Sequence, residues 1–75
     1  MNLPVIDKER TGNKIKMYMQ QQHMTISQLQ LELGMASATN IYYWCRGKYL
    51  PSLDRLVHLA RIFQCKVDDL IVIKE

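Results

Sequence analysis

Hydrogen-bonding side chains gather on one face of a helix predicted in the middle of the chain. At about 100° per residue, Thr39, Tyr43 and Arg46 project from the same side of this segment, and Asn40 and Tyr42 flank them. Such groups can hydrogen-bond to phosphate oxygens or to base edges, and tyrosine rings can press against sugars or thymine methyl groups. The chemistry that this face offers is therefore noncovalent recognition of a polar partner.

Charge is distributed unevenly around this segment. No aspartate or glutamate occurs between Leu33 and Leu53, and residues 10–52 contain five basic residues against Glu32 alone. From Leu53 onward, acidic and basic residues balance. The asymmetry suits a polyanionic partner, because phosphates would meet no like charge there. A chance excess on a solvated face explains the same pattern, and the tyrosines could equally cover a core or a protein interface.

Start and stop signals delimit the helices that must position this face. Thr25 and Gln28 form a capping-box pattern, and Gly34 can end the helix that starts there. Ser37 is the expected N-cap of the next helix, which carries the polar face, and Gly47 is its expected end. An apolar stripe with helical spacing lies opposite the polar face and consists of Ile41, Trp44 and Cys45.

Three further helices complete the predicted fold. Thr11 and Gly12 precede a first helix over residues 13–22, and Pro51 and Ser52 start a fourth. Paired aspartates suit the N-terminal end of a short fifth helix over residues 67–70. Residues 3–6 and 71–73 could pair as strands, with each other or across a dimer, or form packed coil. The expected buried face of the fourth helix consists of Leu53, Leu56, Val57, Leu59, Ala60, Ile62 and Phe63.

Length and composition limit the classes of protein. With 75 residues, 48% of them hydrophobic, the chain is expected to form a single domain over residues 1–75, too small for a two-lobed enzyme. The sequence contains no apolar run near the about eighteen residues needed to cross a bilayer, and its start lacks a signal-peptide pattern. We therefore expect a cytoplasmic protein with no membrane association.

Catalytic and metal-binding groups are few. Cys45 and Cys65 lack CxxC spacing, which argues against a disulfide framework or a four-ligand zinc site and favours two buried thiols. His23 and His58 have no acid or nucleophile beside them at a motif-like spacing. A metal site built from these four residues is the alternative that the sequence leaves open. The prediction is a protein that is not an enzyme and has no cofactor, metal or small-molecule ligand.

Four motifs follow one another along residues 11–71: TGNKIK, TISQLQLELG, IYYWCRGKYLPS and LDRLVHLARIFQCKVDDL. The most specific part is tryptophan-x-arginine-glycine-lysine followed by proline-serine. With these motifs, residues 11–71 resemble the Cro/C1-type (XRE family) helix-turn-helix transcriptional regulators. The resemblance implies an all-α, compact five-helix lambda-repressor-like domain with a core over residues 11–71. It also implies a helix-turn-helix at residues 25–46, whose second helix enters the DNA major groove.

The resemblance also implies which residues contact DNA. The base contacts carried over by position are Thr39, Asn40 and Tyr43. The phosphate contacts carried over by position are Ser37, Arg46, Lys48, Gln28 and Lys14. Tyr42 joins the set because it flanks the same helix face.

The chain departs from the family pattern in several places. One more residue than is common separates Gly34 from the third helix. Ile26 stands where the family often has a phosphate-binding glutamine, and Gln30 replaces a usual small alanine. Met19 and Cys45 occupy positions where the family commonly has an arginine–glutamate pair. Because both partners of that partly buried ion pair are replaced together, we expect Met19 to contact Cys45 without leaving an uncompensated charge.

These features together predict sequence-specific binding of double-stranded DNA by a transcriptional regulator, which we expect to be a repressor. A homodimer is expected, because one short recognition helix covers only a few base pairs. Residues 71–73 and the outer side of the fourth helix are the candidate dimer surfaces. The alternative is a protein-binding module of the same fold, such as an antitoxin or the partner of another regulator, since fold alone does not fix function.

The expected contact between Met19 and Cys45 can be tested by restoring only one charge. Cys45→Glu should lower the melting temperature, because it would place a carboxylate in an apolar site without its basic partner. Thermal unfolding followed by circular dichroism measures the change. An unchanged melting temperature would argue against the contact.

Overall fold

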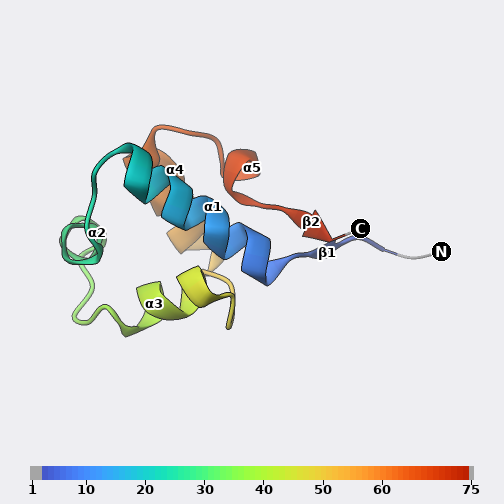
Figure 1. Cartoon of the computed structure of the whole chain (residues 1–75), viewed down its shortest axis with the longest axis horizontal. Coiled ribbons are helices and arrows are strands. Elements are labelled where there is room, and N and C mark those ends of the chain that lie inside the picture. The colour runs from blue at the N-terminus through green and yellow to red at the C-terminus, as the bar shows by residue number, and fades with distance from the viewer. Residues whose placement is uncertain (1–2, 75) are drawn as a thin grey trace.

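The computed structural model describes residues 3–74, which form five helices and one two-stranded sheet (Figure 1). The elements in chain order are β1 (Val5–Ile6), α1 (Lys8–Gln21), α2 (Ile26–Leu33), α3 (Thr39–Arg46), α4 (Leu53–Phe63), α5 (Val67–Leu70) and β2 (Ile73–Lys74). In Figure 1, α1 runs through the middle of the molecule with α3 on one side and α5 on the other. The predicted five-helix class is confirmed. Within residues 3–74, no helix has the length and apolar composition that crossing a membrane requires.

Helix α1 begins at Lys8 and not at residue 13, so the predicted start is wrong. Asp7 is the N-cap, and its side chain accepts a hydrogen bond of 3.0 Å from the backbone N–H of Arg10. Thr11 and Gly12 resembled a helix start in the sequence, whereas both are buried inside α1. A glycine lies inside α1 because the helix packs closely against another helix at this point, and the neighbouring sequence does not reveal such packing.

The capping signals of α2 and α4 are confirmed. The Thr25 hydroxyl accepts a hydrogen bond from the Gln28 N–H at 3.1 Å, and Gln28 Oε1 accepts one from the Thr25 N–H at 2.8 Å. The Ser52 hydroxyl accepts from the Arg55 N–H at 3.2 Å. Each bond satisfies a backbone donor that a helix start leaves unpaired. Gly34 ends α2 in the left-handed conformation, at a φ of 66°.

Helix α3 begins at Thr39, one residue later than it would if Ser37 were the N-cap. Ala38 occupies the N-cap position and has no side-chain acceptor, so the Ser37 hydroxyl reaches the Thr39 N–H at a long 3.4 Å. The predicted cap is therefore wrong by one residue, within the turn that contains the extra residue. Gly47 ends α3, as predicted, at a φ of 75°. A Cβ on Gly47 would also lie 2.6 Å from the Cα of Glu9, so the α3 end is pressed against the start of α1.

The buried face of α4 is narrower than predicted. The residues of α4 that are buried are Leu56, Leu59, Ala60 and Phe63. Leu53 and Val57 are 81% and 57% exposed, so their predicted burial is wrong. The two residues are one helical turn apart and lie on the flank of α4 that faces solvent. Apolar residues on that flank extend the sequence pattern without contributing to the core.

The terminal segments pair with each other within the chain. Val5 lies opposite Lys74 and Ile6 opposite Ile73 in an antiparallel register. The Asp7 N–H then donates to the Val72 carbonyl at 2.7 Å. The Val72 N–H donates to the buried hydroxyl of Thr11 at 3.1 Å. The C-terminal segment is thereby held against the start of α1, which resolves the alternatives that the sequence left open.

The core is organised around the contact between α1 and α3. Ile15 and Met19 of α1 belong to the same buried cluster as Trp44 and Cys45 of α3. Gly12 allows the backbones to approach, since a Cβ there would overlap the Trp44 carbonyl oxygen and lie 2.9 Å from that of Cys45. The cluster places Met19 and Cys45 in one apolar environment, as the paired loss of charge suggests.

Gly12→Ala should destabilise the protein although Gly→Ala within a helix ordinarily stabilises it by about 1 kcal/mol. The added methyl would collide with two backbone carbonyls, and overpacking of this kind costs about 1–3 kcal/mol. Urea unfolding measures the difference. Asn13→Ala is the matched control, because Asn13 is the exposed neighbour of Gly12 in α1. Equal stabilisation by both substitutions would contradict the close approach of α1 and α3.

Candidate nucleic-acid interface

The polar face of α3 is turned to solvent. Thr39 and Arg46 are exposed and Tyr43 is half-buried, while Asn40 and Tyr42 are exposed on either side of them. The opposite side of α3 is buried in the core and carries Ile41, Trp44 and Cys45. This division into a polar outer face and an apolar inner face agrees with the helical spacing of the sequence.

Four side chains join the polar face of α3 to the loop that follows it, and we call them the aromatic cluster: Asn40, Tyr43, Lys48 and Tyr49. The rings of Tyr43 and Tyr49 meet edge to face, with centroids 5.4 Å apart and planes at 67°. The Lys48 ammonium lies 4.2 Å from the centroid of the Tyr43 ring. The Tyr49 hydroxyl donates a hydrogen bond to Asn40 Oδ1. The loop is thereby fixed beside α3, and its lysine lies next to the polar face.

The other flank of α3 faces the start of α2. Tyr42 lines an open, mainly apolar hollow of about 340 Å³ with Thr25 and Ile26 of the α2 start and Lys16 of α1. Gln28 is exposed in the first turn of α2, where its Oε1 is held by the Thr25 N–H. The Gln28 amide nitrogen remains a donor group at the surface, as a phosphate contact requires.

The turn between α2 and α3 is held by two side chains for which the sequence offers no local signal. The Gln30 amide donates to the Met35 carbonyl at 3.2 Å, and the Arg55 guanidinium of α4 donates to the Leu33 carbonyl at 2.8 Å. Ser37 is exposed in this turn. Gln30 stands where the family usually has alanine, and its hydrogen bond stabilises the longer turn that leads into α3.

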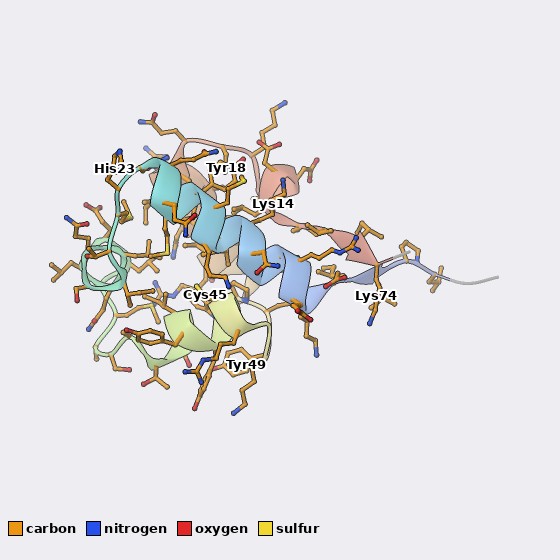
Figure 2. The ribbon with its side chains drawn as sticks, viewed as in Figure 1. Lys14, Tyr18, His23, Cys45, Tyr49 and Lys74 are labelled. Carbon is orange, nitrogen blue, oxygen red and sulfur yellow. The ribbon has the colours of Figure 1, made fainter. Side chains whose placement is uncertain are left out.

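Lys14 is not brought together with the other predicted residues. It is half-buried on α1, and Figure 2 shows it on the side of α1 away from α3 and Tyr49. Lys16 instead lines the hollow that also contains Tyr42 and Cys45. The remaining predicted residues lie on α3, its flanking turns and the start of α2.

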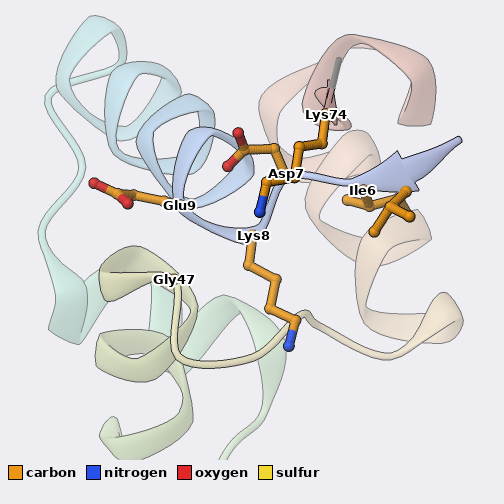
Figure 3. A pocket seen from close by; sticks show the side chains of 7 residues that line it. Ile6, Asp7, Lys8, Glu9, Gly47 and Lys74 are labelled. Carbon is orange, nitrogen blue, oxygen red and sulfur yellow. The ribbon is translucent and has the colours of Figure 1, made fainter.

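Two residues beside the end of α3 and its following loop were missed by sequence reasoning. Tyr49 directly follows Lys48 in a segment without acidic residues, which is the one sequence feature that could have indicated it. Its bond to Asn40 joins residues nine positions apart, so no local pattern predicts it. Lys8 comes close only because Gly47 packs against the first turn of α1. Figure 3 shows its side chain extending toward the loop after Gly47. The adjoining hollow, of about 470 Å³, mixes Lys8 and Lys74 with acidic side chains and does not define an anion site.

The chemistry available at this surface is hydrogen bonding and charge attraction. Burial raises the pKa of the Cys45 thiol, which nearby Lys16 partly opposes, and burial also raises the pKa of the Cys65 thiol. Both thiols are therefore neutral at pH 7 and neither forms a disulfide. Among residues 3–74, no three His, Cys, Asp or Glu side chains are grouped as metal ligands.

Comparison with known proteins identifies the family. The model of the Cro/C1-type HTH DNA-binding domain matches residues 14–75, so the chain belongs to this family of DNA-binding helix-turn-helix domains. No curated protein sequence matches the chain.

Two solved structures share the fold. The DNA-binding domain of BldD superposes with a TM-score of 0.74 at 19% identity, over 88% of this chain and 94% of that one. The S. venezulae BldD DNA-binding domain gives the same TM-score and identity, over 88% of this chain and 97% of that one. At this identity the likeness establishes the arrangement of helices, and the contacts must be argued from the residues of this chain.

Proposed function

We propose that the chain is a transcriptional regulator that binds duplex DNA by inserting α3 into the major groove. The observation that carries this proposal is the exposed polar face of α3, formed by Thr39, Tyr43 and Arg46 opposite a buried apolar face. A major groove admits one helix, and side chains near the N-terminal end of that helix reach the base edges. Thr39 and Asn40 stand at that end of α3, and Tyr43 follows one turn later.

Basic and amide groups around α3 suit contacts with the phosphate backbone. Arg46 and Lys48 are exposed at the C-terminal end of α3 and in the following loop. Ser37 places a hydroxyl in the turn before α3, and Gln28 places an amide group in the first turn of α2. Phosphate contacts at both ends would fix the register of α3 while the bases between are read. We propose that Lys14 does not share in this surface, given its place on α1.

We further propose that the protein acts as a homodimeric repressor within a single domain spanning residues 1–75. Dimerisation would double the number of base pairs contacted, as palindromic operators require. The tail over residues 71–73 is a poor dimer surface, because Val72 and Ile73 are bonded to the start of their own chain. The outer flank of α4, with exposed Leu53 and Val57, supports the other candidate.

The salt dependence of binding separates this proposal from the alternative of a protein-binding module. Affinity for duplex DNA should fall steeply with ionic strength, whereas an aromatic protein interface would respond much less. Arg46→Ala and Lys48→Ala should each weaken binding and reduce the slope of log affinity against log salt by about 1. Fluorescence anisotropy with labelled duplexes at several salt concentrations measures both quantities.

Arg61→Ala and Lys66→Ala are the charge-matched controls for that experiment. Both residues are exposed around the end of α4, outside the helix-turn-helix. They should leave the slope nearly unchanged. If Arg46→Ala and Lys48→Ala behave like these controls, the assigned phosphate contacts are wrong.

Val57→Asp should shift the protein from dimer to monomer. The carboxylate would have to be buried in an apolar interface, while the exposed position of Val57 leaves the fold of the single chain intact. Sedimentation equilibrium measures the mass, and Ile73→Asp tests the terminal surface in parallel. A dimer that survives Val57→Asp but is lost with Ile73→Asp would move the interface to the β1–β2 ribbon.

A further inference from the structure

Asn40 and Tyr49 are bonded in a way that limits what Asn40 can offer to DNA. The amide of asparagine carries an acceptor, Oδ1, and a two-hydrogen donor, Nδ2. The Tyr49 hydroxyl donates its proton to Oδ1, so the acceptor end of the amide is turned toward Tyr49. The donor end must then point away from Tyr49. Asn40 itself is exposed, so this donor end is open to a partner.

The Tyr49 ring has a second contact that does not depend on this bond. Its ring packs edge to face against Tyr43, at 5.4 Å between centroids. Tyr43 also carries the Lys48 ammonium over its ring at 4.2 Å. The contact with Tyr43 favours one position of the Tyr49 hydroxyl beside the amide of Asn40. The ammonium and the amide then give the aromatic cluster two hydrogen-bond donor groups.

We propose that Tyr49 is a positioning residue that makes Asn40 a hydrogen-bond donor toward DNA, so that Asn40 selects acceptor atoms and not the adenine edge. This inference rests on the proposed DNA binding by α3. Asparagine recognises adenine by accepting from N6 while donating to N7, so both ends of the amide must face the base together. Oδ1 keeps a second lone pair, but the bond to Tyr49 turns this end of the amide toward the loop. Guanine presents two acceptors side by side, N7 and O6, and a phosphate oxygen is likewise an acceptor. The donor end of Asn40 matches either source.

The test uses selection of bound duplexes from a random library, followed by affinity measurements on the selected sequence. Wild type is compared with Asn40→Ala, which locates any base pair that depends on Asn40, and with Tyr49→Phe, which removes only the hydroxyl. Tyr18→Phe is the matched control. Its ring stacks on Phe63, and it lies on α1 away from α3 and Tyr49 (Figure 2). Thermal unfolding confirms that each variant is folded.

Recognition of a base is supported if Asn40→Ala loses a guanine preference at one base pair and Tyr49→Phe shifts that pair toward adenine by about fivefold or more. Contact with a phosphate is supported if Asn40→Ala weakens all sequences equally and Tyr49→Phe weakens them by about two- to fivefold without changing any preference. Both results leave the donor role of Asn40 standing and distinguish its target.

Two results would overturn the inference while leaving DNA binding intact. One is a wild-type preference for adenine at the pair that depends on Asn40. The other is a Tyr49→Phe variant that matches Tyr18→Phe in both selection and affinity. If wild type enriches no duplex at all, the proposed function itself fails, and the role of Tyr49 fails with it.

Discussion

The close approach of α1 and α3 at Gly12 is the constraint on which the surface depends. At Gly12 the α1 backbone lies against the carbonyl groups of Trp44 and Cys45. A side chain at this position would collide with these carbonyls and keep the two helices further apart. Trp44 and Cys45 are thereby committed to the core. Because the Trp44 side of α3 is buried against α1, the polar residues on the opposite side of α3 face solvent. The lack of a side chain at Gly12 of α1 therefore determines which face of α3 is available to DNA.

The segments around α3 are secured by different interactions at its two ends. Before α3, the longer turn is held by the Gln30 amide and by the Arg55 guanidinium, which reaches across from α4. After α3, Gly47 packs on the first turn of α1 and Tyr49 closes onto α3. A surface held at both ends loses little conformational freedom on binding, so more of the interaction energy remains for affinity.

Local signals in the sequence predicted most of the helices, and contacts between distant residues account for what they missed. Thr25 and Ser52 could be recognised as caps because their partners lie three residues away. Gly12 was placed before the first helix, because the close packing against α3 that explains a glycine inside α1 is not visible in the local sequence. Leu53 and Val57 fit the apolar pattern of α4, but the pattern does not show which flank of the helix the other helices cover, and both residues are exposed.

The candidate site could be predicted to a similar extent. Helical spacing alone placed Thr39, Tyr43 and Arg46 on one solvent-facing side, and the structure agrees. Lys14 was carried over from the family by position, and only the arrangement of the helices shows that it lies apart from α3. The role of Tyr49 depends on a bond to Asn40 that spans a loop, for which the sequence contains no pattern.

The most direct test of this account is the map of backbone amide chemical shifts when isotopically labelled protein is titrated with a selected duplex. If α3 enters DNA, the largest changes should fall on residues 37–49 and the first turn of α2. The α4–α5 connection and residues 71–74 should change little. Changes concentrated at the chain ends or on α5, with residues 39–46 unaffected, would contradict the proposal that α3 binds DNA.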